Sequence, residues 1–183
     1  MRDVQSDILN FWFSEIKPAQ WFQKSVAFDA DIIARFEPDY KMALQGIYDG
    51  WQGDEKGALA LCILLDQFPR NMYRDTPQAF ASDARALEIA KEAVSKGYDT
   101  LLSTQEKTFL YLPLEHSEVL EDQHQSVQLF AKLMDDDPII YDYAKRHYDV
   151  IKKFGRFPHR NAIMDRKNTS LEEEYLSDPN NGF

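Results

Sequence analysis

The chain has 183 residues, of which 44 % are hydrophobic and 28 % charged, a globular composition that argues against intrinsic disorder. Its formal net charge of −10 argues against a general nucleic-acid binder, and its single cysteine, Cys62, excludes an internal disulfide and a multi-cysteine zinc site. The longest apolar run, 58–65, is too short to span a bilayer, and the N-terminus lacks the apolar core of a secretory signal. We therefore expect a soluble cytoplasmic protein without a membrane partner.

The first helical signals lie near the N-terminus. Ser6 can cap a helix whose apolar residues are Ile8, Leu9, Trp12 and Phe13. Asp29 can start a second helix, and Pro38 is expected to divide it from the piece 39–51, because the residue before a proline disfavours the helical conformation.

The next helix, 55–68, is apolar on every side, which predicts a central and buried position. Asp54 is expected to cap it and Pro69 to stop it. Thr76 and Pro77 then form an N-cap followed by a proline at the first helical position, and the helix that follows ends at Gly97.

The second half of the chain contains helix start and stop signals of the same kinds. Ser103 and Glu106 form a capping box that opens a helix, and Pro113 is expected to break or kink this helix after one to two turns. Asp137 precedes a proline that starts another helix, and Gly155 closes that helix.

Thr169 and Glu172 form a second capping box, for a short acidic helix that ends near Leu176. No segment alternates with period two for long, so we predict an all-α fold of about seven antiparallel helices. Paired helices rich in alanine and aromatic residues make a tetratricopeptide-like stack plausible, although no strict repeat is visible. We expect a single all-α domain over 1–177 and a loose tail over 178–183.

Polar residues fall at positions where the helical pattern expects apolar ones. His116 and Gln123 share the apolar stripe of the helix after Pro113, His147 lies on the stripe of the next helix, and Asp66 closes the apolar helix 55–67. A buried polar group without a partner is costly, so these four side chains are expected to have partners or to line a wet cleft. The stripe residues after Pro113 are Leu112, Val119, Leu120, Val127 and Phe130, and those around His147 are Ile140, Tyr143, Ala144, Ile151 and Phe154.

Arginines at helix ends are the candidate partners. Segment 145–167 holds eight Lys/Arg and two Asp, so it carries +6 in an otherwise acidic chain. An arginine fork matches a carboxylate or a phosphate, so this basic segment can receive a small anion or pair with the protein's own carboxylates. The arginines concerned are Arg70, Arg74, Arg156 and Arg160.

Other chemistry receives little support from the sequence. Glu121 and His124 have the Glu-x-x-His spacing of a di-metal bundle, which needs two such motifs, and only one is present. We therefore predict no metal and no cofactor. No nucleophile motif or phosphate-binding glycine loop appears, so acid–base work by His116 or His147, with Asp66 as a third candidate, is the simplest catalytic hypothesis.

The motifs LDQFPRNMYR, AFASDARAL, YLPLEHSE and FGRFPHRN, with His147 and Thr169–Glu173, occur in this order and cover nearly the whole chain. Together they resemble the bacterial family of domain of unknown function number 924, and this resemblance implies a tetratricopeptide-like helical fold without implying an activity. One departure is Asp165, where the family more often has glycine. Further positions of the family's motifs here are Gln67, Pro69, Asn71, Asp83, Glu118, His159, Asn161 and Arg166.

Three hypotheses remain open at this point. The first is a cleft that binds a small anion through Arg70, Arg74, Gln123, Arg156, His159, Arg160 and Asn161, with His acid–base chemistry. The second is a tetratricopeptide-like module that binds a peptide or acts as a scaffold. In the third, the two Phe-Pro motifs are purely structural. Whether the motifs QFPRN and FGRFPHRN meet at one site, and the oligomeric state, are left open.

Overall fold

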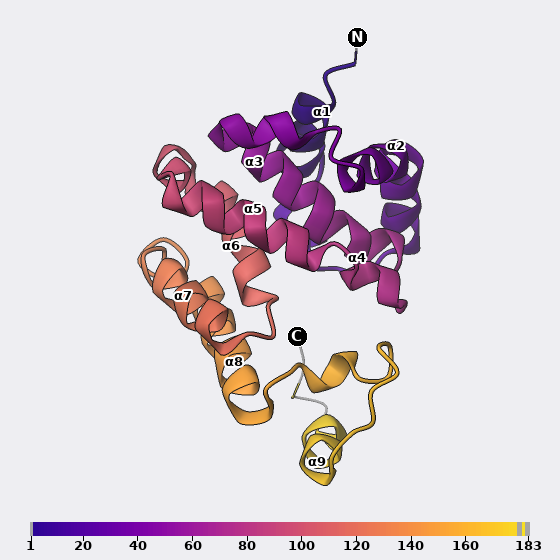
Figure 1. The fold of residues 1–183 in the computed structure, drawn as a ribbon, viewed down its shortest axis with the longest axis vertical. Helices are drawn as coiled ribbons and strands as arrows, with labels where there is room; N and C mark the ends of the chain where they lie inside the picture. Colours follow the sequence, from indigo (N-terminus) through magenta and orange to yellow (C-terminus); the bar gives the residue numbers. More distant parts are fainter. Residues whose placement is uncertain (1, 179–180, 182–183) are drawn as a thin grey trace. The chain divides into compact units, whose positions relative to one another are not determined.

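The computed structural model describes residues 2–178 and 181, and every regular element in that part of the chain is helical. This confirms the predicted all-α class. The chain divides into two compact units, one made of Met1–Arg74 and Gln78–Pro113 and the other of Asp75–Pro77 and Leu114–Phe183 (Figure 1). The single domain over 1–177 stays a prediction. Residues 179–180 and 182–183 of the predicted tail lie outside the described residues.

The first unit is built around the apolar helix α3. Its helices are α1 (Val4–Asn10), α2 (Val26–Leu44), α3 (Glu55–Cys62), α4 (Phe68–Met72), α5 (Asp83–Ser95) and α6 (Thr104–Glu115), the last two residues of which belong to the second unit. Short helical turns connect them: η1 (Phe11–Glu15), η2 (Pro18–Gln20), η3 (Asp49–Gly53), η4 (Ile63–Gln67), η5 (Pro77–Phe80) and η6 (Tyr98–Leu101). Helix α3 packs against α1 and α5, and α2 packs against α4.

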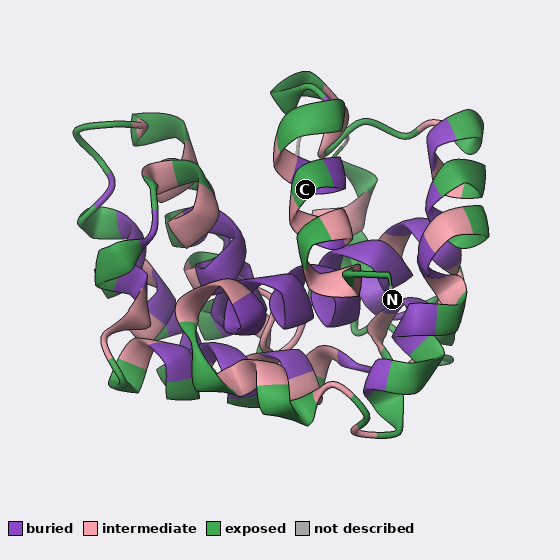
Figure 2. Cartoon of the chain, turned by 90° about the horizontal axis from the view of Figure 1, so that it is seen from above, coloured by how far each residue is buried: buried purple, intermediate pink, exposed green. Residues whose placement is uncertain are grey.

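The predicted central helix is buried along its length. Every residue from Gly57 to Pro69 is buried, and Asp54 caps the start of α3 by accepting a hydrogen bond from Gly57 N at 2.8 Å. Figure 2 shows the contrast with other helices, which are buried on one side and exposed on the other. The sequence of this helix is apolar on every side, which predicted that no side of it faces solvent, and the structure confirms this.

Pro69 does not stop this helix, and the expectation that it would is wrong. The chain stays helical through the π-helical turn η4 and through α4, which ends at Met72. A proline lacks the N–H that would bond to the carbonyl four residues before it, here that of Leu65. The buried hydroxyl of Ser82 donates to this carbonyl at 2.5 Å instead. The side chain of the residue that precedes α5 thus supplies the missing donor.

Pro38 likewise lies inside one continuous helix, so the predicted division of α2 is wrong. Helix α2 begins earlier than Asp29, after Ser25, whose hydroxyl accepts a hydrogen bond from Phe28 N at 3.3 Å. Both Pro38 and Ala34, whose carbonyl loses its partner, are exposed. Water can solvate that carbonyl, so the proline costs less here than in a buried helix.

The second unit contains α7 (Leu120–Ala131), α8 (Pro138–Phe154), the turn η7 (Pro158–Arg160) and α9 (Ser170–Ser177). Helices α7 and α8 pack together, and α9 packs against η7. The predicted caps are confirmed: Asp137 accepts from Ile139 N at 3.0 Å, and Gly155 ends α8 in the left-handed region with φ 72°. The rings of Phe154 and Tyr175, 5.0 Å apart, join α8 to α9.

Pro113 is followed by the predicted break, but the helix continues to Glu115 and the break lies over 116–119. The apolar stripe predicted across this point is therefore partly wrong. Val119 and Leu120 expose 57 % and 47 % of their surfaces, because helical spacing does not carry across an interruption. Gln123 is fully buried as predicted, whereas His116 lies half-buried in the connecting segment.

Gly57 provides a sharp test of the packing around α3. A Cβ at this position would lie 2.0 Å from the carbonyl oxygen of Trp51, whereas a Cβ at Gly53 meets nothing within 4 Å. We expect Gly57→Ala to lower the free energy of unfolding by about 2–3 kcal/mol despite the higher helix propensity of alanine. Gly53→Ala is the matched control and should change it by less than about 0.5 kcal/mol. Urea denaturation of both variants measures the difference, and equal stabilities would contradict the packing described here.

Candidate functional site

Asp66 lies in the first unit, where the chain's own groups surround its carboxylate. The residue is fully buried in η4, and its carboxylate accepts from Gln67 Nε2 at 2.6 Å and lies 3.2 Å from Arg70. Arg70 also donates to the Asp66 carbonyl and forms a bidentate pair with Asp83, both N···O distances being 3.0 Å. The pair connects α4 to the start of α5.

Arg74, one turn after Arg70, pairs with Asp29 of α2. Its guanidinium donates to the two carboxylate oxygens at 2.8 and 2.7 Å, and Asn71 donates to the same carboxylate at 2.8 Å. Burial raises the pKa of Asp29, but the hydrogen bonds from Arg74 and Asn71 outweigh it and hold that pKa below its ordinary value. The motif QFPRN and the arginine after it thus hold α2, α4 and α5 together.

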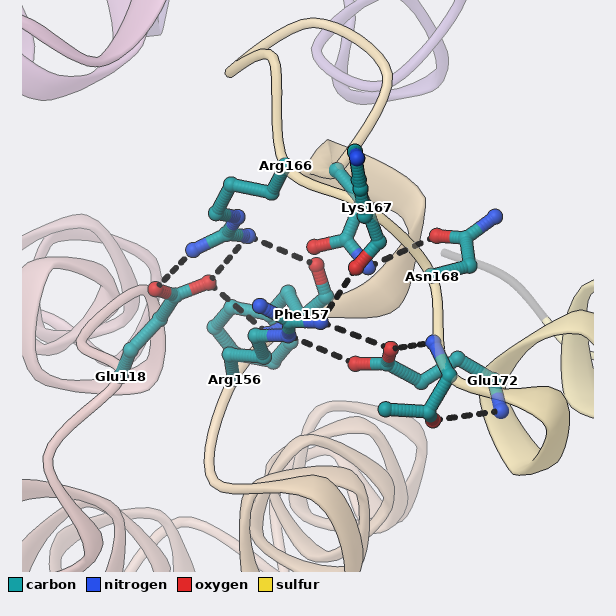
Figure 3. A network of polar contacts seen from close by, with 9 residues as sticks. Glu118, Arg156, Phe157, Arg166, Lys167, Asn168 and Glu172 are labelled. Atoms are coloured by element: carbon teal, nitrogen blue, oxygen red, sulfur yellow. Dashed lines mark hydrogen bonds and ion pairs between the residues drawn. The ribbon is translucent and has the colours of Figure 1, made fainter.

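The second motif, FGRFPHRN, is held by two further arginine–carboxylate pairs (Figure 3). Arg166 donates to the two carboxylate oxygens of Glu118 at 2.7 and 3.0 Å. Glu118 also accepts from Phe157 N at 2.8 Å, and Arg166 donates to Phe157 O at 3.1 Å. Both peptide groups of the buried Phe157 are therefore satisfied by one ion pair.

Arg156 forms the second pair, with Glu172 at the start of α9. Its Nε and one terminal nitrogen donate to the two carboxylate oxygens at 2.6 and 2.8 Å, and the terminal nitrogen also reaches Lys167 O at 2.9 Å. These hydrogen bonds lower the pKa of Glu172 to about 2. Glu172 accepts from Thr169 N at 2.7 Å as well, so the predicted capping box is confirmed and the same carboxylate anchors α9 to the end of α8.

The loop between η7 and α9 explains the departure at Asp165. Asp165 has φ 52°, a left-handed conformation that glycine adopts freely and aspartate tolerates better than most residues. Asn161, almost fully buried at the start of the loop, donates to Asn168 Oδ1 at 2.8 Å and so closes it. A glycine at position 165 would fit the same backbone.

Two histidines flank the Phe157 ring in the second unit, and a third lies beside one of them. The ring centroid of Phe157 lies 5.5 Å from those of both His147 and His159, and the His116 ring lies 6.4 Å from that of His147. The guanidinium carbon of Arg160 lies 4.6 Å from the centre of the Phe157 ring. We call these residues the histidine cluster: His116, His147, His159 and Arg160 around Phe157.

His147 is the buried histidine of the histidine cluster. Its Nδ1 lies 2.9 Å from the Tyr143 carbonyl and 3.1 Å from a carboxylate oxygen of Glu115. Burial lowers the pKa of His147 to about 3. The hydrogen bond to the Tyr143 carbonyl opposes this shift, and the charge of Arg160, together with that of His116 and His159 when they are protonated, adds to it. The ring is therefore neutral at pH 7. Because Nδ1 faces two acceptors, it carries the proton, and Nε2 is the nitrogen with the lone pair.

The other cluster members differ in exposure. His159 is exposed and Arg160 is buried, although they are neighbours in the turn η7. Gln123 of α7 binds the segment that carries His116. Its Nε2 donates to the carbonyls of Glu115 and Ser117, the neighbours of His116 in the sequence, at 2.6 and 2.7 Å. With both amide protons used, the buried Oε1 of Gln123 has no donor among the described protein groups.

The predicted site residues therefore fall into separate groups. Asp66, Arg70 and Arg74 lie in the first unit, and the remaining ones lie in the second. A single site that joins both Phe-Pro motifs stays a prediction. Glu121 and His124 are exposed, and no three His, Cys, Asp or Glu side chains of the described residues are grouped closely enough to hold a metal ion.

Sequence reasoning missed how Glu115 and Phe157 act. Glu115 precedes His116 in the motif YLPLEHSE, but a position beside a histidine does not show that the carboxylate faces His147 on another helix. Phe157 belongs to a basic motif of the sequence, and its ring is the centre around which the cluster is arranged. The sequence signal for this role of Phe157 was its place between Arg156 and Arg160, directly before Pro158 and His159.

Comparison with known proteins agrees with this architecture. A family model described as "Bacterial protein of unknown function (DUF924)" matches residues 8–180. The chain belongs to this family. No protein with a curated description matches the chain.

One solved structure in the comparison is that of the protein of unknown function ATU0120 from Agrobacterium tumefaciens. It is 37 % identical to this chain and superposes with a TM-score of 0.89, and the match covers 94 % of this chain and 96 % of the other. The fold described here for a DUF924 protein is therefore shared with that structure. Among the described residues, no helix has both the length and the apolar composition needed to cross a membrane.

The Glu118–Arg166 pair can be tested through stability. Replacing Glu118 with Ala removes the partner of Arg166 and of Phe157 N, so we expect the free energy of unfolding to fall by about 2 kcal/mol. The control is Glu92→Ala, which breaks the surface pair between Glu92 and Lys96 and should cost less than about 0.5 kcal/mol. Urea denaturation compares the two variants, and a Glu118→Ala variant as stable as the control would refute the anchoring role of Glu118.

The lowered pKa of His147 predicts a pH dependence of stability. Its pKa in the folded protein is about 3, below the ordinary value near 6.5, so the unfolded chain binds more protons between these values. The contribution of His147 is complete above about pH 6.5 and is lost as the pH falls toward 3, by up to ~1.4 kcal/mol per pH unit.

The measurement is urea denaturation at several pH values for the unmodified protein and for His147→Asn. Asparagine keeps a donor near the Tyr143 carbonyl but does not titrate, so the variant should lose less stability on acidification. Parallel pH profiles of the two proteins would show that His147 is not held neutral.

Proposed function

We propose that the histidine cluster of the second unit binds a small anionic ligand that carries a carboxylate or phosphate group. The observation that supports this is the position of two histidines and a buried arginine around the Phe157 ring, with a third histidine next to one of them. These residues come from three separate segments, the 116–119 connection, α8 and η7. Such a gathering of cationic and ionisable groups favours a negatively charged ligand.

The electrostatics of the cluster fit an anion better than a cation. Arg160 keeps its charge at all relevant pH values, and its N–H groups suit the oxygens of a carboxylate or a phosphate. The same positive charge helps to keep His147 neutral. A bound anion would offset that effect and allow a histidine of the cluster to take up a proton, which couples ligand binding to protonation.

His147 is the proposed acid–base group. Its Nδ1 proton is held by the Tyr143 carbonyl and the Glu115 carboxylate, which orients the ring and leaves Nε2 as the base. His116 is the second candidate, because its half-buried ring lies next to that of His147. Asp66 lies in the other unit, where Gln67 and Arg70 engage its carboxylate, and we assign it no role in this proposal.

The hypothesis that the Phe-Pro motifs are purely structural accounts better for the arginines outside the histidine cluster. Arg70, Arg74 and Arg156 each face a carboxylate of the same chain in a bidentate arrangement, which a ligand would have to displace. We therefore restrict the proposed ligand contacts to the histidine cluster, with Gln123 and Asn161 as polar residues next to it in the chain's second unit. The tetratricopeptide-like peptide-binding or scaffold function stays a prediction.

Ligand-dependent thermal stability tests the proposal. Inorganic phosphate, acetate and succinate would each be titrated into the unmodified protein while its Tm is measured. A ligand at a hundred times its Kd adds about 2.7 kcal/mol, which for a chain of this size raises Tm by roughly 5–10 °C. We expect at least one of these anions to produce such a rise.

The matched variants are His159→Gln, in the exposed part of the cluster, and His124→Gln, an exposed histidine of α7 outside it. The rise in Tm should shrink severalfold in His159→Gln and persist in His124→Gln. Arg160→Gln is a second cluster variant, interpreted only if its circular dichroism is unchanged. An equal rise in all variants, or no rise with any of the anions, would exclude this function for the cluster.

A further inference from the structure

A second feature of the molecule lies in the first unit, between η1 and α2, and shares no residue with the histidine cluster. Two large apolar side chains are unusually open here: Phe22 exposes 70 % of its surface and Val26 exposes 87 %. Trp21 beside them is half-buried. We call this region the Phe22 surface: Lys17, Trp21, Phe22, Lys24 and Val26. A group of exposed apolar side chains bordered by polar residues is typical of an interaction site.

The aromatic rings of the Phe22 surface rest on a rigid base. The Phe22 ring stacks on the buried Phe109 with centroids 6.2 Å apart, and the Trp21 ring meets Phe109 edge-on at 4.8 Å. Trp21 Nε1 donates to Trp12 O at 2.9 Å, which fixes the indole. Phe22 is therefore held in place from below while its other face is open, an arrangement that lowers the entropy cost of binding.

The segment that carries the Phe22 surface has a charge opposite to that of the chain as a whole. Residues 16–28 contain no Asp or Glu but include Lys17 and Lys24, whereas the full chain has a formal net charge of −10. Both lysines are exposed, and neither forms an ion pair within the described part of the chain. Most arginines described above face a carboxylate of the protein. The two lysines thus remain available for negative charges from outside.

We propose that the Phe22 surface docks an acidic segment of a partner protein that carries an aromatic or leucine side chain. The apolar side chain would pack on Phe22 and Val26, and flanking carboxylates would meet Lys17 and Lys24. The apolar contact supplies most of the affinity, since exposed ion pairs contribute little, and the lysines set the preference for an acidic sequence.

An acidic peptide fits this surface better than two other occupants. A second copy that used the same surface would bring Lys17 and Lys24 against their own counterparts, and like charges oppose that contact. An anionic bilayer extends far beyond two lysines and would meet the net negative charge of the protein. A short peptide senses mainly the charges within a Debye length, about 8 Å at physiological ionic strength.

Selection from a displayed library of short random peptides tests the proposal with the full chain as bait. We expect enriched sequences to combine Asp or Glu with Trp, Phe or Leu. The affinity of an enriched peptide is then measured by fluorescence anisotropy, beside a matched peptide with Asn and Gln in place of Asp and Glu. We expect the acidic peptide to bind at least tenfold more tightly at low salt and to lose this advantage as salt is added.

Protein variants locate the binding site. Phe22→Ala and the double variant Lys17→Glu/Lys24→Glu should each weaken binding by tenfold or more, and the double variant alters exposed side chains only, so its fold should be unaffected. Leu101→Ala, at another exposed apolar side chain of the same unit, is the control and should bind normally.

Four outcomes would overturn the proposal: no enrichment of acidic apolar peptides, equal affinity of the variants, self-association that Phe22→Ala abolishes, or binding to phosphatidylserine vesicles in preference to the peptides. The last two would assign the Phe22 surface to a second copy or to a membrane. None of these results depends on ligand binding at the histidine cluster, so the two proposals stand or fall separately.

Discussion

Paired arginine and carboxylate side chains hold the helices of this protein together. Each arginine fork meets both oxygens of a carboxylate on a segment distant in sequence: Arg70 with Asp83, Arg74 with Asp29, Arg156 with Glu172 and Arg166 with Glu118. A bidentate pair restricts distance and direction together, so it fixes helix ends that apolar packing alone would leave free to slide. Each of these four arginines is paired with a carboxylate of the same chain, so the charges that lie close to the core are compensated.

The placement of the histidine cluster depends on this constraint. Phe157 enters the core of the second unit two residues after Gly155, and Glu118 and Arg166 satisfy its N–H and carbonyl. With the backbone of Phe157 held, its ring becomes a fixed centre for His147, His159 and Arg160. The chemistry proposed for the cluster thus relies on residues that would touch no ligand themselves.

Local signals in the sequence predicted most helix ends correctly, because caps depend on near neighbours. Asp54, Ser103, Asp137, Gly155 and Thr169 all act where they were expected to act. The first two helix starts were placed a few residues too late, since Asp3 and Ser25 are the N-caps rather than Ser6 and Asp29, and two further errors occurred at prolines. Pro38 and Pro69 lie inside helices, and for Pro69 the reason is a hydroxyl of Ser82, seventeen residues from the Leu65 carbonyl that it satisfies. No local pattern contains that information.

The sequence by itself determined the all-α class, the burial of the helix around Asp66, the inward direction of Gln123 and His147, and the membership of the family. These properties follow from helical periodicity and from short motifs, which act over a few residues. Only the tertiary structure decided which carboxylate meets which arginine, and that Glu115 faces His147 while Phe157 lies between His147 and His159. Such contacts join segments tens of residues apart, and their geometry depends on how helices pack, which the periodicity of a single helix does not specify.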